Sequence, residues 1–171
     1  MFDVVWQRLD YGARLSLPFI TALLGVLLGV LAWPLPHLGA VAPPFALMMV
    51  YYWAIHRPDL FRPWMAFLIG FLNDIVHSLP LGLSALLFVA AHQVIFRQRR
   101  FFVGHSFSMI WWGFALTVFL VTLAAWILQN LIAWTFLPVL PAVMQCVLAI
   151  VLFPLPCWLL IRLQRAAFPQ G

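Results

Sequence analysis

The sequence contains few charged residues, no lysine and no glutamate, and this scarcity limits what the chain can be. Charged residues make up 8% of the 171 residues, hydrophobic residues make up 66%, and the mean hydropathy is +1.08. A soluble globular domain carries about 25% charged residues. The composition therefore excludes a soluble fold and predicts an all-α integral membrane protein.

Residue types that carry out catalysis or bind metals are also scarce. Beyond residue 10 the only acids are Asp59 and Asp74, so a paired-carboxylate mechanism lacks a second acid inside the membrane. The two cysteines, Cys146 and Cys157, are expected to lie about 16 Å apart along one helix, too far for a disulfide. No histidine has a neighbour at metal-ligand spacing, and the local motifs of nucleotide-binding, hydrolase and zinc-protease sites are missing. We therefore expect no catalytic, metal-binding or cofactor-binding residues and no enzyme activity.

All nine basic residues are arginines, and they fall in four clusters separated by pairs of apolar stretches. The intervening turns, around residues 36–42, 78–82 and 129–141, contain no basic residue. Because basic turns of membrane proteins face the cytoplasm, both termini are expected there. The arginines do not form one continuous face, so anionic lipid is a better partner for them than nucleic acid. The clusters are Arg8 and Arg14; Arg57 and Arg62; Arg97, Arg99 and Arg100; and Arg162 and Arg165.

Six apolar stretches are candidates for membrane-spanning helices, since about 20 helical residues cross a hydrocarbon core of roughly 30 Å. The turns between them are too short for a separate domain, because autonomous folds need about 40 residues. Residues 1–171 are therefore expected to form one membrane domain, a six-helix bundle. Residues 1–15 have an amphipathic pattern and are expected to lie along the cytoplasmic headgroups. The spans are expected near 16–35, 41–55, 63–79, 81–96, 107–126 and 142–161.

Asp74 lies inside the third span, about 16 Å from its start at Pro63. An ionised Asp at the centre of a span costs about 2.5–3.5 kcal/mol, so the side chain should face protein or water. We expect Asp74 or Asn73 to hydrogen-bond the free amides at the start of the fourth helix. Proton or cation coupling is less favoured, because no second buried charge is available. A stripe of small residues also includes Asp74, and another helix can approach closely along it: Ala66, Gly70, Asp74 and Ser78.

Three further features concern helix packing. Gly25 and Gly29 form a GxxxG pair in the first span, for which contact within the chain is the default expectation. Pro154 and Pro156 are expected to kink or interrupt the sixth span and to leave carbonyl groups that need partners. His92, inside the fourth span, is expected to make a polar contact between helices.

The turn at residues 56–62, with the third helix and the turn that follows it, resembles the MreD family of rod-shape-determining membrane proteins. The resemblance centres on residues 51–100, and the six-span length and arginine layout extend it across the chain. It rests on an Arg-Pro-Asp turn, a Gly four residues before an Asp, and a Pro-Leu-Gly turn. The chain departs from the family pattern at Asn73, where Gln is often found, and at His77 and Ser78, where glycine is common. The matching residues are Arg57, Pro58, Asp59, Gly70, Asp74, Pro80, Leu81 and Gly82.

The resemblance implies a non-enzymatic scaffold of the bacterial elongation machinery, embedded in the cytoplasmic membrane with several spans. The implied partners are an MreC-like single-span protein, a peptidoglycan polymerase with its class B transpeptidase, and the actin-like MreB cytoskeleton. A hypothesis that follows is that the small-residue stripe is exposed and binds the partner helix. The family is also similar in fold to the substrate-binding components of energy-coupling-factor vitamin transporters, so vitamin binding is the alternative. Nine residues are the structural or partner-binding candidates: Arg57, Pro58, Asp59, Gly70, Asn73, Asp74, Pro80, Leu81 and Gly82.

Overall fold

The computed structural model describes residues 2–30, 33–35, 39–102, 104 and 106–167. Within these residues the chain is helical apart from one short antiparallel β-ribbon, in which Trp33 pairs with Val41 and Leu35 with Gly39. The elements are α1 (Phe2–Val30), β1 (Trp33–Leu35), β2 (Gly39–Val41), α2 (Phe45–His56), α3 (Pro63–Val76), α4 (Leu83–Phe102), α5 (Phe107–Ala133), α6 (Val139–Leu152) and α7 (Pro154–Ala167).

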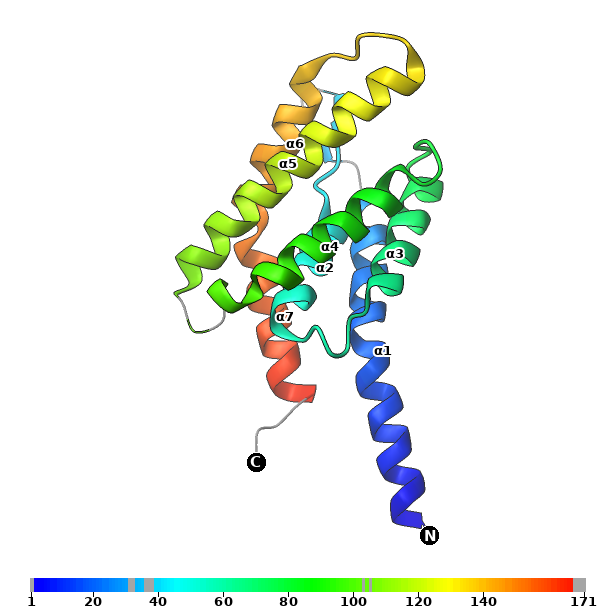
Figure 1. Ribbon diagram of the computed structural model, residues 1–171, viewed down its shortest axis with the longest axis vertical. Coiled ribbons are helices and arrows are strands. Elements are labelled where there is room, and N and C mark those ends of the chain that lie inside the picture. Colours follow the sequence, from blue (N-terminus) through cyan, green and yellow to red (C-terminus); the bar gives the residue numbers. More distant parts are fainter. Residues whose placement is uncertain (1, 31–32, 36–38, 103, 105, 168–171) are drawn as a thin grey trace.

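Consecutive helices pack in pairs, α1 with α2, α3 with α4, and α5 with α6 (Figure 1). The α3–α4 pair has the most extensive contact, and α2 also packs against α4. The start of α1 and the end of α7 lie toward the same end of the molecule, together with the turn between α2 and α3. The turn between α3 and α4 and the turn between α5 and α6 lie toward the opposite end. The segments that carry arginine are therefore gathered at one end of the bundle.

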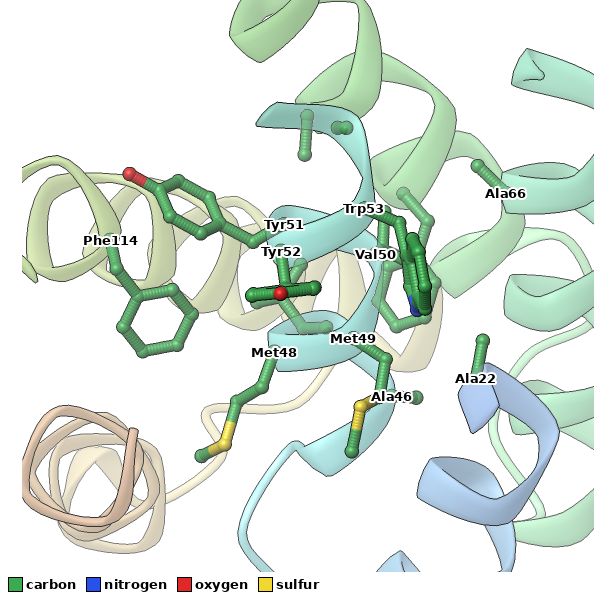
Figure 2. Close-up of a cluster of buried hydrophobic side chains, with 14 of the residues drawn as sticks. Ala22, Ala46, Met48, Met49, Val50, Tyr51, Tyr52, Trp53, Ala66 and Phe114 are labelled. Atoms are coloured by element: carbon green, nitrogen blue, oxygen red, sulfur yellow. The ribbon is translucent and has the colours of Figure 1, made fainter. Parts of the chain in front are cut away.

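Helix α2 is the centre of the bundle. All ten residues from Ala46 to Ile55 are buried, as expected of a helix that is apolar on every side. Figure 2 shows side chains of α1, α3 and α5 arranged around it. The ring of Tyr51 packs edge-on against Phe114 of α5, with 5.2 Å between ring centroids. Trp53 donates a hydrogen bond of 2.9 Å to the hydroxyl of Thr21 on α1, so the polar edge of this buried indole is satisfied.

Prolines and the β-ribbon correct the expected ends of the first two spans. The first span was expected to be helical to residue 35, but α1 ends at Val30 and residues 33–35 form β1. The second was expected from residue 41, but α2 begins at Phe45, because Pro43 and Pro44 precede it and proline disfavours helix in the residue before it. Helix α1 runs without a break from Phe2, so the amphipathic segment continues directly into the first span. Its placement along the headgroups stays a prediction.

The sixth span is interrupted where its prolines predict. Helix α6 ends at Leu152, α7 begins at Pro154, and the two are bent by 43°. Pro154 has no N–H to donate to the carbonyl of Ile150 four residues earlier. Trp111 of α5 donates its indole N–H to that carbonyl at 2.9 Å. The neighbouring helix thus satisfies a group that the proline leaves without its helical partner.

The packing role expected for the glycine pair in α1 is confirmed. A Cβ atom on Gly25 would lie 3.0 Å from the side chain of Met49 in α2, and one on Gly29 would lie 3.1 Å from the ring of His77. Both contacts are within the chain. The buried His92 pairs through Nε2 with the carbonyl of Phe61, 2.9 Å away, so its polar contact is with the α2–α3 turn rather than with another helix.

The helices differ in whether they could cross a membrane alone. Within the described residues, α5 is long and apolar enough, and α6 with α7 passes the same test as one bent span. Residues 16–30, α2 and α3 are shorter apolar helices. Helix α2 has 12 residues, about 18 Å at 1.5 Å per residue, and so is shorter than the hydrocarbon core. The expected count of six spans stays a prediction.

Candidate functional site

The nine candidate residues fall into two groups at opposite ends of α3. Gly70, Asn73 and Asp74 lie in the second half of this helix and are followed by the Pro80-Leu81-Gly82 turn. The Arg57-Pro58-Asp59 turn precedes the helix. The 14 residues of α3 extend about 21 Å, so the two groups do not form one site. The first group is compact and defines the candidate site, whereas the second lies at the arginine-rich end.

The carboxyl group of Asp74 accepts hydrogen bonds from the start of α4. The backbone N–H of Gly82 donates to Oδ2 at 2.9 Å, and the N–H of Ser84 donates to Oδ1 at 2.9 Å and to Oδ2 at 3.1 Å. Asp74 is fully buried, so these bonds compensate for its loss of water. The hydrogen bonding expected from the sequence is therefore present. An acidic group at this position also interacts favourably with the positive end of the α4 dipole.

Asn73 adds a side-chain contact across the same helix pair. Its Nδ2 donates to the hydroxyl of Ser84 at 3.1 Å. Ser84 thus joins both Asn73 and Asp74 to the first turn of α4, a role that its sequence position alone did not single out. A serine two residues after the predicted turn glycine was the available signal, since small polar residues often hydrogen-bond at helix starts.

Gly70 permits direct backbone contact between α3 and α4. A Cβ atom at this position would lie 2.5 Å from the Cα of Ala85 and 2.6 Å from the carbonyl oxygen of Ser84. Both are backbone atoms, which cannot rotate away as a flexible side chain can. The absence of a side chain at Gly70 therefore sets the distance at which Asp74 reaches α4, one turn further along α3.

The α3–α4 turn contains two residues with positive φ. Ser78 has φ of 53° and Gly82 has φ of 94°. The N–H of Leu79 donates to the carbonyl of Asp74 at 2.9 Å, which closes the end of α3 in the pattern of a Schellman motif. Glycine normally occupies the left-handed position of this motif, and Ser78 occupies it here. The departure from the family pattern at Ser78 thus coincides with backbone strain.

Changing Ser78 to glycine should stabilise the chain by about 0.5–1 kcal/mol, because glycine adopts the left-handed conformation without the penalty of a Cβ atom. For a chain of this size the expected rise in Tm is about 1–4 °C. Thermal unfolding of the detergent-solubilised protein would measure the change. Ser106→Gly is the matched control, because Ser106 has φ of −63° and no strain to relieve. Equal shifts for the two variants would contradict this account.

The small-residue stripe does not form an exposed surface. Of its four residues, Ala66, Gly70 and Asp74 are buried and Ser78, in the turn after α3, is exposed. The close approach of Gly70 to Ala85 shows that α4 covers the helical part of the stripe. The hypothesis that a partner helix binds along this exposed stripe is therefore wrong. The sequence showed that a helix should pack there, but it did not show that the next helix of the same chain does so.

The second group of candidates lies in the turn between α2 and α3. The carbonyl of Arg57 accepts hydrogen bonds from the N–H groups of Leu60, at 3.1 Å, and Phe61, at 3.2 Å, which fixes the turn. Pro58 and Asp59 line a cavity of about 420 Å³, together with residues of α2 and with Arg99 and Arg100 from the end of α4. The α2–α3 turn and the arginines at the end of α4, which are distant in sequence, thus meet at one end of the bundle.

Within the described part of the chain, no group of three or more His, Cys, Asp or Glu side chains is placed to hold a metal ion. Cys146 and Cys157 are buried free thiols. The hydrogen bonds of Asp74 can hold α3 against α4 and fix the turn between them.

The apolar helices, the arginines gathered at one end and the internally braced α3–α4 pair define a helical membrane protein. The family model described as rod shape-determining protein MreD matches residues 12–163 of the 171-residue chain. The chain belongs to the MreD family, a membrane-associated family involved in determining rod shape. No curated protein matches the sequence. No solved structure matches either. The family match gives no support to the vitamin-transport alternative.

Proposed function

We propose that this chain is a non-enzymatic scaffold of the bacterial cell-elongation machinery and acts inside the cytoplasmic membrane. In this role it binds an MreC-like single-span protein and couples that partner to peptidoglycan synthases. The family match over residues 12–163 is the observation that carries the proposal. The arginine-rich end would face the cytoplasm, where anionic lipid and the MreB cytoskeleton are available to it.

The proposed topology has six spans, formed by α1, α2, α3, α4, α5 and the bent pair α6–α7. An even number of spans agrees with the positions of the start of α1 and the end of α7, which lie toward the same end of the molecule (Figure 1). The arginines support the same orientation, since Arg99 and Arg100 end α4 and Arg165 ends α7. The α3–α4 and α5–α6 turns would then lie outside the cytoplasm.

The α3–α4 turn is the surface we propose for partner binding. Leu81, at its tip, is 68% exposed although its neighbour Gly82 is fixed by the buried Asp74. A rigid turn that presents an apolar side chain can bind a partner with little loss of conformational entropy. In the proposed topology this turn lies where the external domain of a single-span partner leaves the membrane. Asp74 and Gly70 would then contribute to binding indirectly, by holding the turn in place.

Changing Leu81 to alanine should reduce recovery of the MreC-like partner about fivefold, the loss expected when a contact worth about 1 kcal/mol is removed. The measurement is affinity purification of the tagged chain from native membranes in mild detergent, with quantification of partners by mass spectrometry. Leu86→Ala is the matched control, because Leu86 is 63% exposed on α4 and lies outside the turn.

Three outcomes of this experiment are informative. Loss of the partner with Leu81→Ala and retention with Leu86→Ala would support the proposed surface. Equal recovery with both variants would exclude the turn but leave the scaffold function standing. Recovery of an ATPase module or a stoichiometric vitamin in place of a single-span partner would overturn the scaffold function itself.

A further inference from the structure

A cavity of about 410 Å³ lies at the end of the bundle opposite the arginine-rich turns. Its walls come from α1 through α6, so it lies between the α5–α6 hairpin and the first four helices. Small-molecule sites in proteins commonly have volumes of about 300–1,000 Å³ and a mostly apolar lining with a few polar groups. This cavity matches that description and plays no part in the scaffold function proposed above.

The polar side chains in the cavity have hydrogen-bonding capacity to spare. Asn73 donates its amide N–H to Ser84, which leaves the Asn73 carbonyl oxygen and the Ser84 hydroxyl proton available. Gln145 donates to the carbonyl of Ala42 at 3.2 Å, which leaves its own side-chain oxygen available. Gln129 lines the cavity and makes no hydrogen bond within the described part of the chain. The cavity lining therefore includes both hydrogen-bond donors and acceptors.

No Asp, Glu, Lys or Arg is found among the described residues that form the walls. His77 is the one titratable side chain among them, and its Nδ1 pairs with the backbone carbonyl of Asn73 at 3.0 Å. Asp74 lies behind the first turn of α4, and both of its oxygens already accept backbone hydrogen bonds. A charged ligand would lose its hydration without gaining a counter-ion, which is costly in a partly buried site. A hydroxyl or an amide can instead donate to one polar wall group and accept from another.

We propose that this cavity is a binding site for an uncharged small molecule that carries hydroxyl and amide groups. Asn73, Ser84, Gln129 and Gln145 supply its hydrogen bonds, and the apolar walls, which include Phe88, contact the rest of the molecule. Because the polar groups come from α3, α4, α5 and α6, a bound molecule connects the α3–α4 pair to the α5–α6 hairpin. Ligand binding would therefore fix the position of the hairpin relative to the α3–α4 turn.

Three sugars that differ in charge test the proposal. The full chain is reconstituted in phosphatidylcholine nanodiscs, and binding is measured by saturation-transfer NMR and isothermal titration. N-acetylglucosamine is the neutral probe, because it combines hydroxyl groups with an amide. Glucosamine and glucuronate are the cationic and anionic probes. The neutral sugar should bind at least about tenfold more tightly than either charged sugar.

Two cavity variants locate the site. Gln129→Leu should weaken binding of N-acetylglucosamine about three- to tenfold through the loss of hydrogen bonds. Ala125→Trp should abolish binding, because Ala125 lines the cavity and an indole would fill it. The matched controls are Gln93→Leu and Ile127→Trp, which place the same new side chains at exposed helix positions outside the cavity. Both controls should bind as the original chain does.

The result that overturns the proposal is equally specific. Absence of N-acetylglucosamine binding by the original chain, or equal binding of the charged sugars, would exclude a neutral polar site. Unchanged binding in a correctly folded Gln129→Leu or Ala125→Trp variant would place the sugar elsewhere. Thermal unfolding of each variant identifies misfolding, and the two cavity substitutions are chemically independent, so failure of one leaves the other as a test.

Discussion

Replacing Asp74 by leucine should destabilise the chain by about 2–6 kcal/mol, because two backbone N–H groups lose their acceptor and each buried unsatisfied donor costs about 1–3 kcal/mol. The substitution keeps a side chain of similar length but removes every acceptor for the N–H groups of Gly82 and Ser84. Buried N–H groups without acceptors lose their hydration with no compensation. The first turn of α4 should therefore separate from α3.

The unfolding free energy of Asp74→Leu can be measured by denaturant titration in mixed micelles. Asp74→Asn should lie between the original chain and the leucine variant, because an amide retains one acceptor oxygen. Arg165→Gln, at an exposed position near the end of α7, is the control and should change stability by less than about 0.5 kcal/mol. A loss for Asp74→Leu no larger than that of the control would show that the hydrogen bonds to α4 do not support the fold.

The same pair of variants connects stability to partner binding. At equal protein level, Asp74→Leu should lower recovery of the MreC-like partner more than Arg165→Gln does, because the turn that presents Leu81 depends on Asp74. This loss is indirect. If Asp74→Leu remains folded and recovers the partner fully, the hydrogen bonds from Gly82 and Ser84 to Asp74 are not needed for partner binding.

Contacts between neighbouring segments could be predicted from the sequence. Asp74 and Ser84 are ten residues apart, and Pro80 and Gly82 between them mark a turn. When an acid precedes such a turn and a helix follows it, the first amides of that helix are the nearest donors for the carboxyl group, because those amides need acceptors. The break between α6 and α7 was predictable for a similar reason, since proline removes a helical hydrogen bond wherever it occurs.

Contacts between distant segments could not be predicted in the same way. The stripe that includes Gly70 showed that some helix packs closely, but α4 and a partner helix meet that requirement equally well. The 410 Å³ cavity brings together Asn73 and Gln145, which are 72 residues apart in the sequence, and no local pattern marks either residue as a neighbour of the other. The β-ribbon was missed because Trp33 and Leu35 continue an apolar run that resembles the end of a helix.

The second large effect is expected at Gly70, where alanine should destabilise the chain by about 3 kcal/mol. Its Cβ atom would lie 2.5 Å from the Cα of Ala85, about 1 Å closer than an ordinary contact. Helix α4 can relieve this overlap only by moving away from α3 as a whole. Gly25→Ala is a graded control, because its Cβ atom would lie 3.0 Å from the Met49 side chain and 3.1 Å and 3.2 Å from two backbone atoms at the start of α2. These overlaps are smaller than those at Gly70, so the cost should be smaller.

A double-mutant cycle distinguishes a simple steric clash from a clash that also breaks the Asp74 contact. If α4 moves away, the hydrogen bonds from Gly82 and Ser84 to Asp74 lengthen, and part of the cost of Gly70→Ala is their loss. In an Asp74→Leu background those bonds are already absent, so Gly70→Ala should cost about 1–2 kcal/mol less. Additive costs would mean that the helix spacing and the buried carboxyl group act independently. Non-additive costs would mean that the close helix approach at Gly70 holds the Asp74 carboxyl group within reach of the α3–α4 turn. Helix packing would then determine the position of the surface proposed for the partner.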